Sequence, residues 1–290
     1  VSSGQSPDIE IEVFAGLPSG ILLGTGDTIV ELKSDGTTQE VFNPSIGVTY
    51  SAKRDGDRYL AVGNGGVLVT LGANGQWSEG QIDPDYGFNF RDIGKVGDAY
   101  FVIGGSGAVY KSSDGNSWAD LTISSSPSLK AVASFGSRII VAGGAYNSPT
   151  AWYSDDGGQT FTEASVDIAY NYLGSIASGP DGLVAGRGDD LQFSSDGSSW
   201  SEIPMSNYSF IDGDTDMWVN DMIYHANTYI AVGRDNNDTR PNRSMVLTSS
   251  DGQTWTEVDA PASNLTNIDS TEEGLIATGV EGTIIRSTDG

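Results

Sequence analysis

Short apolar runs that end in glycine recur along the chain, for example YLAVG at 59–63, YFVIG at 100–104 and LIATG at 275–279. A continuous apolar run of this length is typical of a strand that is buried on both faces. Each run is followed by a glycine turn, a second strand, a polar motif and then an alternating strand such as WTEV at 255–258. No segment carries a sustained apolar stripe at helical spacing. The pattern predicts an all-β fold of many short strands.

The polar motif is itself a repeat of the form S-x-D-G. Its aspartate, or the asparagine of a degenerate copy, falls at Asp35, Asn74, Asp114, Asp156, Asp196, Asp251 and Asp289. Successive copies lie about 40 residues apart, and the sixth carries an insertion of about 15 residues. Four short strands per repeat are typical of a β-propeller. The sequence predicts a single domain over residues 1–290, a seven-bladed β-propeller of four-stranded antiparallel blades.

The predicted blades cover approximately residues 8–43, 44–82, 83–123, 124–165, 166–204, 205–259 and 260–290. The chain stops at IIRSTDG, residues 284–290, inside a motif that continues to a tryptophan in KSSDGNSW at 111–118. We therefore expect the last blade to be incomplete or to be closed by the N-terminus. Closure by another chain or domain, and trimming from a longer protein, are the other options, because an unpaired sheet edge accepts an added strand.

The motif copies resemble the Asp-box family, also called BNR repeats, whose pattern is S-x-D-x-G-x-x-W. The copy at 154–161 matches it with phenylalanine for tryptophan, and the copies starting at Ser112, Ser194 and Ser249 follow a form one residue shorter. The family includes sialidases, sortilin-type receptors and photosystem assembly factors. The resemblance covers the whole chain and implies a propeller whose Asp boxes lie away from the ligand face.

The residues of the motif indicate a structural role. Serine and aspartate side chains can accept the unpaired N–H groups of a tight turn. Glycine supplies a positive φ, and the tryptophan covers neighbouring apolar side chains. We expect the repeated aspartates to stabilise turns and not to bind a metal or catalyse a reaction.

Composition narrows the function classes. The net charge is −25, which disfavours nucleic acid and anionic membranes, because phosphate contacts need clustered Lys and Arg. The chain has no cysteine and no apolar run near the roughly 18 residues that span a membrane. It begins at Val1, which suggests a processed product. We expect a secreted protein, extracellular or on the cell surface, that does not insert into a membrane.

The sixth repeat has two long loops on the face where propellers usually bind ligands, SNYSFIDGDTDMWVND at 206–221 and GRDNNDTRPNRS at 233–244. The first contains D-x-D-x-D, and alternating loop carboxylates suit the flexible oxygen coordination of calcium. The predicted Ca²⁺ ligands are Asp212, Asp214, Asp216, Asp235 and Asp238. The alternative is a solvated acidic loop in a very acidic protein, because the EF-hand pattern is not completed.

Aromatic residues occur on the same connections. Exposed rings beside polar side chains often hold sugars, so the candidate ligand-binding residues are Tyr86, Tyr170, Tyr172, Tyr208, Phe210, Trp218 and Arg234. The alternation in DYGFNF at 85–90 suits an ordinary packed strand equally well. Packing between blades is therefore the alternative for these rings.

Three functional hypotheses follow. The first is a non-catalytic recognition or adhesion propeller that binds a glycan or a protein surface through the sixth-repeat loops, ordered by calcium. The second is a sialidase-like glycoside hydrolase or polysaccharide-cleaving enzyme; Arg91, Arg187 and Arg234 come from different blades and could converge, but the family's F/Y-R-I-P motif is missing. The third is a structural subunit of a cell-surface assembly. The only histidine, His225, lies in an apolar run, and the balance favours a protein without catalysis.

Overall fold

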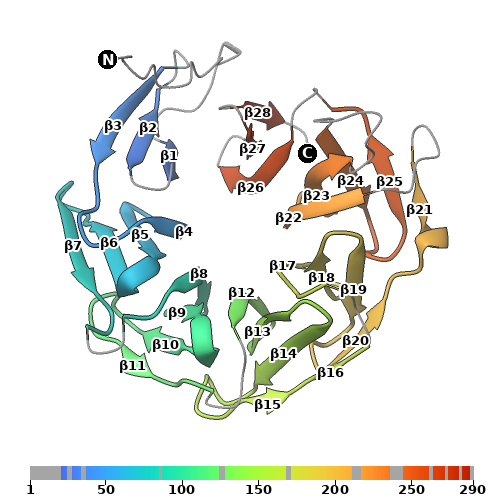
Figure 1. Cartoon of the computed structure of the whole chain (residues 1–290), viewed down its shortest axis with the longest axis horizontal. Coiled ribbons are helices and arrows are strands. Elements are labelled where there is room, and N and C mark those ends of the chain that lie inside the picture. The colour runs from blue at the N-terminus through green and yellow to red at the C-terminus, as the bar shows by residue number, and fades with distance from the viewer. Residues whose placement is uncertain are drawn as a thin grey trace, which may run out of the picture.

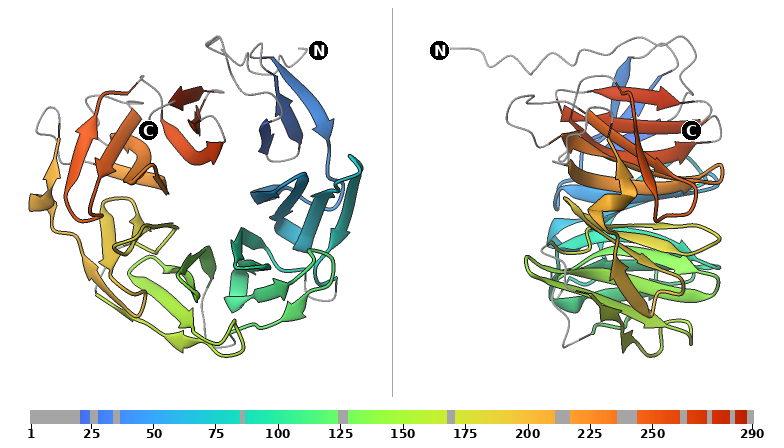
Figure 2. Two further views of the ribbon diagram at one scale, coloured as in Figure 1. Left: turned by 180° about the vertical axis from the view of Figure 1, so that it is seen from behind. Right: turned by 90° about the vertical axis from the view of Figure 1, so that its right-hand side faces the viewer.

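The computed structural model describes residues 21–24, 28–33, 37–84, 87–123, 128–167, 171–210, 217–235, 244–260, 264–271, 274–280 and 283–287. Their strands form seven sheets that follow one another around a central axis (Figure 1). The strands run across the thickness of the ring, so each sheet reaches both of its faces (Figure 2). No helix among these residues is long and apolar enough to cross a membrane.

The first four sheets contain consecutive strands. The first has β1 (Ile21–Gly24), β2 (Ile29–Leu32) and β3 (Thr38–Phe42). The second has β4 (Thr49–Asp55), β5 (Arg58–Gly63), β6 (Val67–Leu71) and β7 (Trp77–Gln81). The third has β8 (Phe90–Val96), β9 (Ala99–Gly104), β10 (Val109–Ser112) and β11 (Ala119–Asp120). The fourth has β12 (Leu129–Phe135), β13 (Arg138–Ala145), β14 (Ser148–Ser154) and β15 (Thr162–Glu163).

The fifth and sixth sheets have five strands each. The fifth has β16 (Ser165–Val166), β17 (Ser175–Ser178), β18 (Leu183–Arg187), β19 (Asp190–Ser194) and β20 (Ser199–Glu202). The sixth has β21 (Tyr208–Ser209), β22 (Met217–His225), β23 (Thr228–Asp235), β24 (Ser244–Ser249) and β25 (Trp255–Val258). The last has β26 (Leu265–Thr271), β27 (Gly274–Gly279) and β28 (Ile284–Ser287). Single 3₁₀ turns are η1 (Asn64–Gly66), η2 (Gly105–Gly107) and η3 (Met205–Asn207).

The all-β class is confirmed, but the prediction of seven four-stranded antiparallel blades is wrong. Six blades surround the central channel, because the described residues that line it come from β4, β8, β12, β17, β22, β26 and the segments next to them. The sheet β1–β3 supplies no described residue to the channel lining. Five of the six blades have four or five strands, and β26–β28 has three among the described residues. Two of the motif copies that were counted, at Asp35 and Asp289, lie outside the described residues.

The fifth strand of each larger blade is a short parallel strand at the outer edge. β16 pairs with β20, and β21 pairs with β25, each over two residues. In both cases the short strand lies at the outer edge of its blade, and the next described strand, β17 or β22, lies at the inner edge beside the channel (Figure 1). The short strand therefore covers an edge that would otherwise expose unpaired backbone groups.

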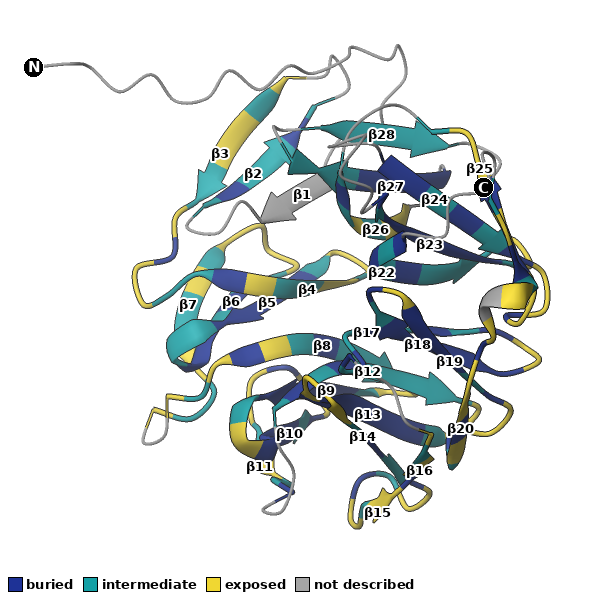
Figure 3. Cartoon of the chain, turned by 45° about the vertical axis from the view of Figure 1, so that its right-hand side comes forward, coloured by how far each residue is buried: buried dark blue, intermediate teal, exposed yellow. Residues whose placement is uncertain are grey.

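The core lies between neighbouring blades, as the glycine-ended apolar runs predict. Leu60, Val62 and Val102 are fully buried in one cluster that joins the second and third sheets, and Val141 lies in the cluster of the next pair. Figure 3 shows buried residues along the middle strands and exposed residues mainly in the turns and on outer strands such as β3. Packing on both faces of these strands stabilises the ring without helices.

The glycine that ends each apolar run makes room for a β-bulge in the inner strand of its blade. A Cβ on Gly104 would lie 2.4 Å from the carbonyl oxygen of Asn89, and one on Gly63 would lie 1.8 Å from that of Val48. Both glycines have an extended backbone, with φ of −173° and −169°, so space and not φ requires glycine. Bulges interrupt the pairing of β4, β8, β12, β22 and β26 near their starts. A bulge directs one extra residue away from the ladder.

The S-x-D-G turns have the structural role that their residues predict. In the third sheet the Ser112 hydroxyl accepts the N–H of Gly115 at 2.8 Å, and the Asp114 carboxylate accepts the N–H groups of Asn116 and Ser117. Gly115 has φ of 72°. These hydrogen bonds, first that from Ser117, hold the pKa of Asp114 below its usual value. The serine repeats its contact in three more turns, those that contain Gly158, Gly197 and Gly252.

Candidate recognition site at the channel mouth

The bulged residues of the inner strands gather at one mouth of the channel. They are the residues skipped in the pairing of β4, β8, β12, β22 and β26, namely Tyr50, Arg91, Lys130, Asn220 and Thr266. All five line a cavity of about 470 Å³ that opens at the face where the inner strands begin. We call this place the channel mouth. Five of the six blades therefore each present one side chain to it by the same backbone device.

Three cations of neighbouring blades lie over two tyrosine rings at the mouth. The Arg91 Cζ atom lies 4.7 Å from the ring centroid of Tyr50, and the Lys130 Nζ atom lies 4.3 Å from that of Tyr172. Arg187 approaches the same Tyr172 ring at 5.7 Å. Cation–π contacts of this kind hold the charged groups in place without neutralising them.

The blade of the fifth sheet, β16–β20, reaches the mouth in a different way from its neighbours. The inner position there is Gly174, which has no side chain to present. A Cβ on Gly174 would lie 3.0 Å from the Tyr172 ring and 3.1 Å from the Arg187 side chain. The glycine therefore leaves the space in which Tyr172 and Arg187 pack together.

The charges of Arg91, Lys130 and Arg187 have no ion-pair partner within the part of the chain that the structure describes. Burial lowers the pKa of the Lys130 ammonium, and the positive charges of Arg91 and Arg187 lower it further. The three cations therefore repel one another in a partly desolvated place. In a protein of net charge −25, such a cluster is a positive site in a negative surface.

Two carboxylates lie one residue further along the inner strands and tie the blades together. Asp92 accepts hydrogen bonds from the Ser51 hydroxyl and the Val132 N–H of the two adjacent blades. Asp221 does the same with the Ser175 hydroxyl and the Ile268 N–H. Burial raises the pKa of both, that of Asp221 to about 6. Both oxygens of each carboxylate are used within the fold.

The structure places the predicted aromatic residues in different surroundings. Tyr172 is at the channel mouth, whereas Tyr208 is buried and stacked on Phe210 at 6.0 Å. The Arg234 guanidinium lies 5.5 Å from the Trp218 ring, on the strand pair β22–β23. Tyr86 and Tyr170 lie outside the described residues.

Only one of the five predicted calcium ligands lies within the described residues. Asp235 is buried at the end of β23, and Asp212, Asp214, Asp216 and Asp238 lie outside the described ranges. Within those ranges no group of three or more acidic or histidine side chains could hold a metal ion. Calcium binding stays a prediction.

Sequence reasoning missed Tyr50 and Lys130 and considered Arg91 only for an enzyme. A signal for these residues is present in the repeat. The bulged residue stands thirteen positions before the glycine that ends the next apolar run, as Arg91 does before Gly104 and Lys130 before Gly143. Aligning the repeats on that glycine, and not on the S-x-D-G motif, would have placed the bulged residues in one ring.

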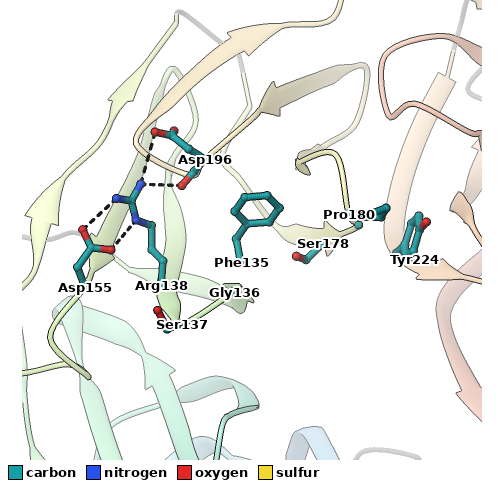
Figure 4. Close-up of a pocket in the computed structure, with 10 residues that line it drawn as sticks. Phe135, Gly136, Ser137, Arg138, Asp155, Ser178, Pro180, Asp196 and Tyr224 are labelled. Carbon is teal, nitrogen blue, oxygen red and sulfur yellow. Dashed lines mark hydrogen bonds and ion pairs between the residues drawn. The ribbon is translucent and has the colours of Figure 1, made fainter.

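The opposite face, where the S-x-D-G turns lie, has its own cavity of about 710 Å³ between the fourth, fifth and sixth sheets (Figure 4). Its one cation, Arg138, is fully engaged: Nε and Nη2 donate to Asp155, and Nη1 donates to the carbonyl of Asp196 at 2.7 Å. Phe135 stands in the middle of this cavity, with Tyr224 at its far side (Figure 4). The polar wall is therefore part of the fold and is not an open charged site.

Comparison with known proteins agrees with this architecture. The chain belongs to the DUF6242 beta propeller domain family, whose model matches residues 48–273. No curated protein sequence matches it. Among solved structures it is similar to YCF48 from Cyanidioschyzon merolae, with 15% identity, a TM-score of 0.63 and coverage of 94% of this chain and 97% of that one.

Two further structures are similar over most of their length. A YCF48 structure bound to a D1 peptide has 16% identity and a TM-score of 0.62, covering 85% of this chain and 80% of that one. The computationally designed Ika8 protein has 14% identity and a TM-score of 0.62, covering 93% and 83%. At these identities the similarity shows the propeller fold alone.

Proposed function

We propose that this member of the DUF6242 propeller family is a non-catalytic recognition domain that binds a segment of a protein partner at the channel mouth. The observation that carries the proposal is the cluster of Arg91, Lys130 and Arg187 on the rings of Tyr50 and Tyr172. Side chains that are held in place but not neutralised within the described fold are suited to contact a partner.

Other features of the same face support a protein partner. Ile46, Tyr50 and Tyr146 are three of the four large apolar side chains that are exposed among the described residues, at 42%, 45% and 67%. They lie on the loops and strand starts of the mouth face, whereas the fourth, Val258, lies on an outer strand. Exposed aromatic side chains next to arginine are typical of protein interfaces. A YCF48 propeller of similar fold has been seen with a bound peptide, which makes the same mode reasonable for this chain.

We propose a function without catalysis because two carboxylates of the channel, Asp92 and Asp221, are committed to the fold. A hydrolase needs a pair of carboxyl groups that can exchange protons with substrate. Asp92 and Asp221 instead accept backbone and serine hydrogen bonds through both of their oxygens.

Several finer predictions belong to this proposal. We propose that the S-x-D-G turns make the chain an Asp-box propeller, because four of them share the serine-to-glycine hydrogen bond. We also propose a role in adhesion outside the cell or on its surface, which fits the strongly acidic composition. Calcium ordering of the loop at 206–221 is proposed from its alternating aspartates, and a rise in the thermal unfolding midpoint with calcium over chelator would support it.

The experiment is a peptide array that contains short peptides of varied composition, probed with the whole chain. The test variant is Arg91→Met with Lys130→Met. The matched control is Arg54→Met, which changes an exposed arginine whose Nε bonds the carbonyl of Gly56 on the opposite face. Binding that is lost in the double variant and retained in the control supports the proposal. Peptide binding that is equal in all three proteins, or absent from all, contradicts it.

A further inference from the structure

We infer that the channel mouth recognises a carboxylate-rich, acidic segment of a protein, whose side-chain carboxylates bridge Arg91, Lys130 and Arg187. This inference rests on the proposed function and names the chemistry of its ligand.

The five bulged residues at the channel mouth differ in whether their side chains are bonded within the fold. Asn220 donates its amide to the carbonyl of Leu265 at 2.7 Å, and Thr266 donates its hydroxyl to the carbonyl of Thr278 at 3.1 Å. These two bulged residues therefore serve the fold. Arg91 and Lys130 stand at the same place in their own blades but make no side-chain hydrogen bond or ion pair within the described residues. Among the bulged residues, only the neighbouring Arg91 and Lys130 therefore offer a positive charge to a ligand, and this charge lies on one side of the channel mouth.

The positive charges of Arg91, Lys130 and Arg187 repel one another in the cluster. Lys130 lies close enough to Arg91 and Arg187 for both to lower its pKa, in addition to the effect of its burial. Carboxylates placed between these cations would relieve their repulsion, and each arginine fork can hold a carboxylate through two hydrogen bonds. Cations from three neighbouring blades are more than one carboxylate can engage. A segment with several carboxylates matches this spread.

Two carboxylates limit how deep an anionic ligand can enter the channel. Asp92 and Asp221 lie one residue beyond the bulged row on their strands, so negative groups border the site on the channel side. They oppose an anion that moves deeper into the channel. The ligand carboxylates are therefore held at the level of Arg91 and Lys130, where the rest of the segment can contact Tyr50.

The net charge of −25 does not decide against an acidic ligand. At physiological salt the Debye length is about 8 Å, so acidic groups elsewhere on the surface are largely screened. Direct contacts with Arg91, Lys130 and Arg187 are much less screened, because Lys130 and Arg187 are partly buried. Local attraction therefore exceeds the remote repulsion.

A uronate polysaccharide also carries carboxylates, but the mouth face favours a protein. Ile46 and Tyr146 are exposed on loops of that face, and apolar side chains of a polypeptide can cover them. The backbone N–H groups of Ser45 and Ile46 are held by Glu79, at 2.8 Å and 2.6 Å, so this apolar loop is fixed in place.

The test uses the whole chain and a labelled peptide in which glutamates alternate with leucines. A matched peptide has glutamine in place of every glutamate, and polygalacturonate represents the polysaccharide. At physiological salt we expect the glutamate peptide to bind at least about tenfold more tightly than the glutamine peptide. Lys130→Met and Arg91→Met should each remove most of that preference, and Arg54→Met should keep it.

Each other outcome is informative. Equal binding of the two peptides, weakened by the mouth variants, overturns the acidic inference and leaves the proposed function intact. Binding of neither peptide overturns the inference, and the array decides whether the proposed function also fails. Tighter binding of polygalacturonate than of the glutamate peptide overturns the choice of a protein ligand.

Discussion

Lysine and arginine side chains lie on both faces of the propeller, but the fold bonds them on one face and leaves them without a described acceptor on the other. On the face of the S-x-D-G turns, cations of one blade donate to turn carbonyls of the next: Arg58 to Asp114, Lys111 to Gly157 and Arg138 to Asp196, at 2.7–2.8 Å. On the mouth face, Arg91 and Lys130 lie over tyrosine rings with no described acceptor.

The difference comes from the backbone. A tight turn exposes carbonyl groups that need donors, so nearby cations are bound by the fold. A bulge instead turns one side chain out of the ladder, and the long side chains of Arg91 and Lys130 extend to tyrosine rings and not to a described carbonyl. The role of a lysine or arginine in this molecule therefore depends on whether a tight turn or a β-bulge lies beside it.

The largest expected effect comes from closing the space that a bulge needs. Gly104→Ala would place a Cβ 2.4 Å from the carbonyl oxygen of Asn89, so β8 and β9 must separate. We expect a loss of about 2–3 kcal/mol in the free energy of unfolding, measured by urea titration, because backbone cannot yield as a side chain can.

The matched control for this change is Gly80→Ala, where nothing lies within 4 Å of the added Cβ. It should alter the free energy of unfolding by a few tenths of a kcal/mol at most. Similar losses in the two variants would show that glycine at the end of β9 does not make room for the bulge.

The next largest effect distinguishes a cation that the fold bonds, Arg138, from one that it does not, Arg91, by the free energy of unfolding. Arg138→Met removes the hydrogen bond to the Asp196 carbonyl and should lower the free energy of unfolding by about 1–2 kcal/mol. Arg91→Met removes no described hydrogen bond, and the relief of repulsion with Lys130 offsets the lost contact with the Tyr50 ring, so stability should be nearly unchanged. Urea titration of both variants tests this contrast. An equal loss in Arg91→Met would mean that the fold already neutralises Arg91.

The smallest effect concerns pH. The pKa of Asp221 is raised by burial to about 6, while in the unfolded chain it is near the ordinary value of about 4. Between pH 4 and pH 6 the Asp221 carboxyl therefore binds a proton in the folded state but not in the unfolded state. Its contribution to the free energy of unfolding is fully present below pH 4 and is lost as the pH rises through 6. We expect about 1 kcal/mol from it, since the carboxylate lines an open channel.

The measurement is the free energy of unfolding between pH 4 and pH 7 for the wild type and for Asp221→Asn. The variant should lose this part of the pH dependence. Asp57→Asn, in the exposed turn before β5, should retain it. A wild-type slope that persists in Asp221→Asn would assign the proton to another group.

Much of the fold can be predicted from the sequence because its signals are local. Apolar runs such as YFVIG became buried strands, and Ser112 and Asp114 form the hydrogen bonds that their turn requires. The blade count could not be obtained in the same way. The repeat at Asp35 shows in the sequence that a turn motif is present, but not whether the strands of that repeat line the channel. Two-residue strands such as Ser165–Val166 have no pattern at all.

Less of the candidate site than of the fold can be predicted from the sequence. Tyr172 was identified as one of several aromatic residues on connections, whereas Lys130 occupies a bulge that resembles the ordinary start of a strand. Its importance depends on Arg91 and Arg187, which are distant in sequence and approach only when the blades close around the channel. Such convergence requires the register of three inner strands, which local patterns do not supply.

The central claim, that the mouth cations are not neutralised by the fold, is tested most directly by the pKa of the Lys130 ammonium. It can be followed by NMR of the lysine side chain during a pH titration, with Lys130→Arg to assign the signal. We predict a pKa below that of an exposed lysine, and a rise when the glutamate–leucine peptide is added. A pKa at or above that of an exposed lysine in the free protein would contradict the account.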